Sequence, residues 1–111
     1  MHCVLRYDES TAVLAGTVED ARCGGWVRGA VVQLREIVQP PAPYKLRPAG
    51  TDELGRFEIA ALEAGRRYAL TVRRTVAGID LYEEYGDTLE FAPGERREYA
   101  AKVNRIEPCP T

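Results

Sequence analysis

Hydrophobic and polar residues alternate in short runs along most of this chain. Phe57 and Ile59 are separated by charged Glu58, and Leu70 and Val72 recur with the same period of two. Because neighbouring side chains of a strand point to opposite faces, such runs predict strands with one buried face. The same pattern predicts further strands that bury Leu14, Gly16 and Val18; Ala30, Val32 and Leu34; Leu89 and Phe91; and Tyr99, Ala101 and Val103.

Turn residues separate these runs. Asp52 and Gly55 predict a tight turn before Phe57, and Pro93-Gly94 predicts another before the last strand. The stretch 39–43 holds three prolines, which favours a surface loop, with a short edge strand over 44–47. No amphipathic helix longer than a turn or two is evident. Short strands at this spacing predict an all-β fold, an antiparallel β-sandwich of seven strands.

Length and composition indicate one soluble globular domain over residues 1–111, with a core over about 12–103. The chain is 45% hydrophobic and 29% charged, with a net charge of −2. This balance argues against disorder and against a nucleic-acid partner, and no apolar run could span a membrane. We expect a monomer in isolation. The first residues lack the features of a signal peptide, so an exported natural protein would carry a leader outside this sequence.

Three cysteines, Cys3, Cys23 and Cys109, are spaced like no metal-binding motif, so we expect neither a metal nor a cofactor. Cys23 follows the first predicted strand in a glycine-rich loop, and the other two lie near the ends of the sequence. In an oxidising compartment, a disulfide from Cys23 to Cys3 or to Cys109 is expected. Three free thiols are the alternative.

Four segments, 16–20, 27–34, 51–57 and 62–72, together resemble the carboxypeptidase regulatory-like family of transthyretin-like, or prealbumin-like, domains. The resemblance covers roughly residues 12–103. It implies a seven-stranded Greek-key sandwich without catalytic residues of its own. It also implies an accessory, spacing or binding module, because such domains are common in exported and surface proteins.

Catalytic chemistry has few candidate residues here. Ser10 and His2 are the single serine and histidine, and they form no nucleophile and base motif. One histidine also argues against the transthyretin-like hydrolases of purine catabolism. Lys102 and Asn104 lie on the same predicted strand, which disfavours the isopeptide bond of pilin-type domains. We therefore expect a protein that is not an enzyme.

Aromatic residues in predicted loops are the candidate binding residues: Trp26, Tyr44, Tyr82 and Tyr85. Exposed aromatic rings can stack on sugars or contact a protein partner, whereas buried ones would only close the rim of the core. The acidic residues among which the last two tyrosines lie could offer oxygen ligands to calcium, but their spacing favours a solvated acidic face.

The sequence thus favours a non-catalytic accessory or protein-interaction module, located outside the cell, on its surface or in a periplasm. A cytoplasmic location stays open. The main alternative is a carbohydrate-binding module of the starch-binding-like kind that uses the loop aromatics on a surface polysaccharide. A third possibility is the regulatory domain of an enzyme whose catalytic part lies elsewhere.

Overall fold

The computed structural model describes residues 11–38 and 46–109, so Cys3, Tyr44 and the proline-rich stretch 39–43 lie outside the described residues. The described residues form strands and no helix, and thus no helix that could cross a membrane. The strands are β1 (Thr11–Asp20), β2 (Val31–Glu36), β3 (Leu46–Gly50), β4 (Arg56–Glu63), β5 (Arg67–Arg73), β6 (Thr75–Val76), β7 (Ile79–Asp80), β8 (Gly86–Glu90) and β9 (Arg96–Val103).

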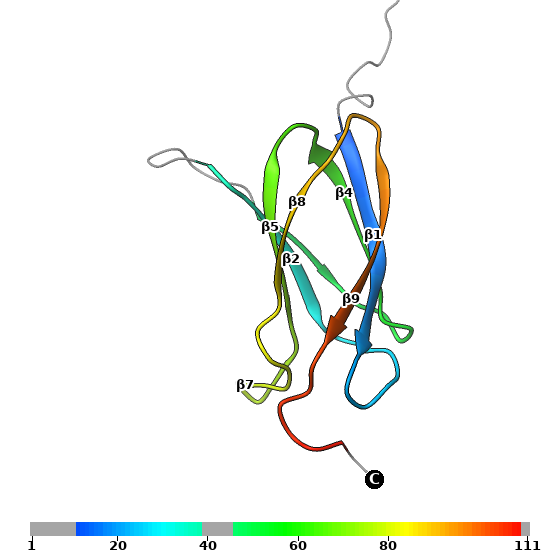
Figure 1. Cartoon of the computed structure of the whole chain (residues 1–111), viewed down its shortest axis with the longest axis vertical. Coiled ribbons are helices and arrows are strands. Elements are labelled where there is room, and N and C mark those ends of the chain that lie inside the picture. The colour runs from blue at the N-terminus through cyan, green and yellow to red at the C-terminus, as the bar shows by residue number, and fades with distance from the viewer. Residues whose placement is uncertain (1–10, 39–45, 110–111) are drawn as a thin grey trace, which may run out of the picture.

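Two sheets form the sandwich (Figure 1). One has three strands in the order β4-β1-β9, and the other has four in the order β3-β2-β5-β8. The chain changes sheet between β1 and β2, β3 and β4, β4 and β5, and β8 and β9, which is Greek-key connectivity. The short strands β6 and β7 pair only with each other. The all-β sandwich predicted from the alternating pattern is therefore confirmed.

Three details differ from the prediction. The described residues form nine strands rather than seven, because the two-residue strands β6 and β7 make a separate hairpin. The sandwich is not wholly antiparallel, because β1 runs parallel to β9 from Val13↔Arg96 to Asp20↔Val103. The edge strand expected over 44–47 appears as β3, which begins at Leu46 and continues to Gly50; Pro48 fits there because β3 lies at the edge of its sheet.

The core lies between the two sheets and contains the residues that the alternating pattern selected. Leu14 and Val18 of β1 are fully buried, as are Val32 and Leu34 of β2. Tyr68 of β5 and Phe91, which follows β8, meet edge to face with ring centroids 6.0 Å apart. Burying each of the larger apolar side chains contributes about 1.5–3 kcal/mol, so this core holds the two sheets together.

Gly16 of β1 lies against the backbone of β9. A Cβ built at this position would lie 1.9 Å from the backbone oxygen of Tyr99, its register partner, and 3.1 Å from the ring of Phe57. No side chain fits there without moving the backbone, so glycine is required by space rather than by its φ angle. The backbones of β1 and β9 therefore approach each other too closely here for a side chain at position 16.

Candidate functional site

One end of the sandwich gathers a loop, a hairpin and the C-terminal tail, at the bottom of Figure 1. The loop that follows β1 is built on Asp20, whose side chain is buried. Its Oδ1 accepts hydrogen bonds from the backbone N–H of Arg22 at 3.0 Å and of Cys23 at 2.7 Å. Gly24 and Gly25 have φ angles of 80° and 87°, which other residues rarely adopt, and they let the chain return toward β2.

A disulfide joins Cys23 of this loop to Cys109 of the tail, with 5.4 Å between the Cα atoms. This is one of the two pairings that the sequence left open. The guanidinium of Arg22 adds hydrogen bonds to the backbone oxygens of Arg105 at 3.1 Å and of Ile106 at 3.4 Å. The tail is therefore attached to the loop by one covalent bond and by contacts from the neighbouring arginine.

The tail also pairs with the segment before β8. The backbone N–H of Glu83 donates to the oxygen of Asn104 at 2.8 Å, and that of Ile106 donates to Leu81 at 3.0 Å. These bonds surround an antiparallel bridge between Tyr82 and Arg105. The segment 81–83 is thus held in place by the same tail that the disulfide fixes.

Trp26 lies at the end of the disulfide loop, and 53% of its surface is exposed. Its backbone forms an antiparallel bridge with Glu19, and the next residue, Val27, donates a hydrogen bond to Val18 at 2.9 Å. The buried hydroxyl of Thr51 donates to the oxygen of Val27 at 2.7 Å and accepts from the N–H of Ala30 at 2.8 Å. The indole is therefore presented to solvent from a backbone that is fixed on both sides.

The turn between β3 and β4 passes directly beside Trp26. Gly55, with φ 70°, is buried there, and a Cβ at its position would lie 2.6 Å from the oxygen of Val18 and 3.1 Å from Cβ of Trp26. Leu54, the residue before it, is 49% exposed. Trp26 and Leu54, two large apolar side chains, are thus exposed on adjoining turns. If Trp26 closed the end of the core, its side chain would instead be covered.

Tyr82 and Tyr85 line a cavity of about 440 Å³. We call it the tyrosine groove; its other lining residues are Gln33, Thr71, Val72, Arg73, Asp80, Glu83 and Glu84. Gln33, Thr71 and Arg73 come from neighbouring strands β2 and β5, and the remainder of the polar lining comes from the segment 80–85. The alternating pattern places these three strand residues on the polar faces of ordinary strands, so it did not connect them with the tyrosines.

Both tyrosines of the groove also have structural contacts, because they are half-buried and pack against the core. The hydroxyl of Tyr82 donates to Oδ2 of Asp20 at 3.2 Å, and burial together with that carboxylate raises the pKa of Tyr82. The hydroxyl of Tyr85 lies 2.7 Å from that of Tyr99, which donates to Asp87 at 2.7 Å. That hydrogen bond lowers the pKa of Asp87, and burial raises the pKa of Tyr99.

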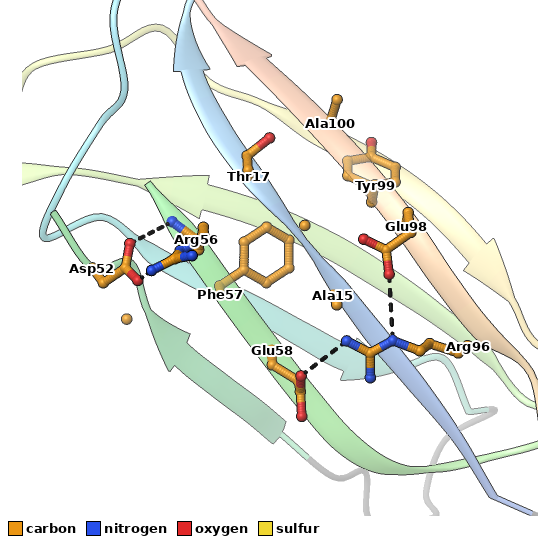
Figure 2. A pocket seen from close by; sticks show the side chains of 12 residues that line it. Ala15, Thr17, Asp52, Arg56, Phe57, Glu58, Arg96, Glu98, Tyr99 and Ala100 are labelled. Atoms are coloured by element: carbon orange, nitrogen blue, oxygen red, sulfur yellow. Dashed lines mark hydrogen bonds and ion pairs between the residues drawn. The ribbon is translucent and has the colours of Figure 1, made fainter. Parts of the chain in front are cut away.

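A second, more open cavity of about 630 Å³ lies on the three-stranded sheet (Figure 2). We call it the sheet trough. Strand β1 contributes small residues to this trough, namely Ala15, Gly16 and Thr17. Arg96 of β9 reaches Glu58 of β4 at 3.2 Å, across the central strand, and Glu98 at 3.4 Å, as the dashed lines of Figure 2 show.

The other rim of the sheet trough is the exposed ion pair of Asp52 and Arg56 at 3.1 Å, which Figure 2 also shows. Hydrogen bonds from the backbone and side chain of Arg56 lower the pKa of Asp52. The charged groups of the trough are therefore already paired with one another. None of the residues proposed from the sequence lines it, and the run of small residues in β1 is the signal that could have indicated it.

The described residues contain no group of three or more His, Cys, Asp or Glu side chains placed to hold a metal ion. Trp26 lines neither the tyrosine groove nor the sheet trough, and Tyr44 is outside the described residues. The structure therefore brings together two of the four aromatic candidates, Tyr82 and Tyr85, and places Trp26 apart from them on the disulfide loop.

No family model matches this chain, and no curated protein matches it in sequence. Solved structures do match in fold. A crystal structure of (S)-allantoin synthase aligns with a TM-score of 0.62 and 18% identity over 87% of this chain. A chlorocatechol 1,2-dioxygenase from Pseudomonas putida aligns with a TM-score of 0.58 and 11% identity over 88% of it. This chain spans 41% and 61% of those two proteins.

An alternative pilotin from the type II secretion system of Vibrio cholerae aligns over 88% of this chain and 99% of its own length, with a TM-score of 0.52 and 18% identity. A minor pilin of Streptococcus agalactiae aligns over 92% of this chain and 46% of its own, with a TM-score of 0.51 and 17% identity. At these identities the matches show a common β-sandwich fold. The fold occurs in enzymes and in secretion-related proteins alike, so function has to be argued from the site.

Proposed function

We propose that this chain is a non-catalytic interaction module that acts in an oxidising compartment, outside the cell, on its surface or in a periplasm, and binds a protein partner. We place it among the carboxypeptidase regulatory-like modules that its sequence resembles. The observation that carries the proposal is Trp26, half-exposed on a loop that a disulfide and a buried hydrogen-bond network fix.

A fixed, exposed tryptophan suits binding because burying it against a partner gains a large apolar area and costs little conformational entropy. Leu54 on the adjoining turn extends the apolar surface. A disulfide between residues 86 positions apart is favoured where thiols are oxidised, which supports a location outside the cytosol. The similar folds of a pilotin and a minor pilin agree with such a setting.

Photo-crosslinking tests this proposal. A photoreactive benzoylphenylalanine is placed at position 54, beside Trp26, and the labelled protein is exposed to the extracellular and envelope fractions of its source. We expect one crosslinked protein, which excess unlabelled wild type removes. Trp26→Ala should compete at least about tenfold less well, since losing an interface tryptophan costs about 2 kcal/mol or more. The same label at Val31, which is similarly exposed on β2, is the control.

Circular dichroism of Trp26→Ala must show a folded domain, as expected for a side chain that is half in solvent. If Trp26→Ala competed as well as wild type, Trp26 would not be central to binding the partner. Competition by soluble polysaccharide, with a shift in tryptophan fluorescence that saturates, would instead support the carbohydrate-binding alternative.

A further inference from the structure

The residues that line the tyrosine groove carry more negative than positive charge. Arg73 is its one cation, and its Nη2 contacts both carboxylate oxygens of Asp80, at 3.2 and 3.1 Å. The hydroxyl of Thr75 donates to the same carboxylate at 3.0 Å. Asp80 and Arg73 therefore satisfy each other, as the lowered pKa of Asp80 also indicates.

Glu83 and Glu84 are the remaining charged residues of the groove. Both are exposed, and within the described part of the chain neither carboxylate has an ion pair or a hydrogen bond to a side chain. One arginine against three carboxylates, 1 − 3, leaves the lining with a charge of −2. Within this lining, the excess of carboxylates attracts a cation more strongly than an anion.

The tyrosines add aromatic surface beside this charge. Their hydroxyls already bond Asp20 and Tyr99, and both rings pack against the core on one side. Their positions are therefore fixed before any ligand binds, and the two residues line the cavity with hydroxyls that are already hydrogen-bonded. Aromatic rings next to unpaired carboxylates are a common environment for a guanidinium or an ammonium group.

The backbone around the groove is held firmly as well. The segment 81–83 pairs with the tail residues 104–106, and the disulfide fixes the tail to the loop after β1. On the strand side, Thr71 has Gly86 as its register partner in β8, so no side chain of β8 extends over the groove beside Thr71. The cavity of about 440 Å³ is ample for one long side chain.

We propose that the tyrosine groove binds a lysine or arginine side chain of the protein partner, with Glu83 and Glu84 as its counter-charges and Tyr82 and Tyr85 as its aromatic walls. This inference rests on the proposed function, because it assigns a chemistry to the partner. The occupant is a basic segment of a protein, and a neutral oligosaccharide is an outcome of the test.

The test is an NMR titration of the full chain, labelled with ¹⁵N, against the blocked peptide Gly-Arg-Gly. We expect shifts at 71–73 and 80–86 and a millimolar dissociation constant, which is usual for one side chain. Raising the salt concentration should weaken binding severalfold through screening. A peptide with norleucine in place of arginine should cause no saturable shift at these positions.

The double variant Glu83→Gln/Glu84→Gln should lose about tenfold in affinity for the arginine peptide. The control is Glu53→Gln/Glu98→Gln, which changes the net charge equally on exposed residues that do not line the groove, and it should bind like wild type. Equal losses in both double variants would show a general charge effect and overturn the inference. Binding of norleucine as tight as that of arginine, or saturable shifts at the groove with maltooligosaccharide alone, would also overturn it.

The two proposals fail separately. If crosslinking from position 54 identifies a partner but the arginine peptide does not bind, the assignment of the groove is wrong and the proposed function stands. If no partner is crosslinked, the proposed function fails whatever the peptide does.

Discussion

Replacing Thr51 with valine should destabilise the domain and loosen the loop that carries Trp26. The two side chains have nearly the same shape, so the substitution removes the hydroxyl with little change in packing. That hydroxyl is buried, and it bonds the oxygen of Val27 and the N–H of Ala30. In the variant both backbone groups would lose their partner without gaining water. At about 1–3 kcal/mol for each of these two unsatisfied buried groups, we expect a loss of about 2–6 kcal/mol.

Urea unfolding followed by circular dichroism measures this loss. Since about 1 kcal/mol shifts the melting temperature of a domain this size by about 4–8 °C, thermal melts should fall by at least about 8 °C. Thr51→Ser keeps the hydroxyl and should lose less than valine. Thr88→Val, on the exposed face of β8, is the matched control and should stay within about 0.5 kcal/mol of wild type. A loss below about 1 kcal/mol in Thr51→Val would refute this role for the hydroxyl.

Three further predictions concern the disulfide, the close approach of two strands, and one carboxylate. Removing the bridge with Cys23→Ala/Cys109→Ala should lower the free energy of unfolding in urea by about 2–4 kcal/mol, while Cys3→Ala should change it little. The loss expected for the double variant is below the full loop-closure value, because the released tail can fray in the folded state. Gly16→Ala should lower the free energy of unfolding by about 3 kcal/mol or more, or prevent folding. Gly86→Ala should be neutral or slightly stabilising, because its Cβ would meet nothing nearer than 3.7 Å. Equal effects of the two substitutions would contradict the packing argument. Tyr99→Phe should raise the pKa of Asp87 toward its ordinary 3.8, as measured by ¹³C NMR. A carboxyl group whose pKa is lowered in the folded state stabilises the fold above about pH 4, and this stabilisation is lost as the pH falls through the folded-state pKa. The variant should therefore lose less stability than wild type between about pH 5 and pH 2. An unchanged pKa of Asp87 would count against the hydrogen bond.

Local alternation predicted the longer strands well because the sandwich buries one face of β2, β4 and β5. Leu14, Val18, Val32, Leu34 and their counterparts in the later strands are buried as the period of two required. The parallel pairing of β1 with β9 could not be seen this way, since alternation is the same for either direction. The hairpin of β6 and β7 was missed because two-residue strands are too short for a pattern.

The candidate site was only partly predictable for a similar reason. Tyr82 and Tyr85 were found from residue type, but whether their hydroxyls face solvent or bond Asp20 and Tyr99 depends on strands distant in sequence. The strand half of the groove, with Arg73 and Thr71, depends on the pairing of β5 with β2 and β8. The choice of Cys109 over Cys3 likewise required the path of the tail beside the disulfide loop.

Aromatic candidates that seemed equivalent in the sequence have different surroundings in the structure. Trp26 is fixed through its backbone and keeps about half of its surface exposed, whereas Tyr82 and Tyr85 are half-buried and pack against the core. Their substitution should therefore affect the domain differently: alanine at Trp26 leaves the core intact, but alanine at either tyrosine removes core packing as well as the groove wall. For this reason the binding test of the groove substitutes Glu83 and Glu84 and leaves both tyrosines in place.

We propose that this domain works in an oxidising compartment, where the bridge between Cys23 and Cys109 fixes the end that carries Trp26. Whether this bridge forms is measured by peptide mapping without reductant, on protein isolated from its natural source and alkylated at once. We expect the peptides containing Cys23 and Cys109 to be recovered as a linked pair, with neither residue alkylated. Recovery of both residues as alkylated, unlinked peptides would contradict it and would direct the search for partners to the cytoplasm.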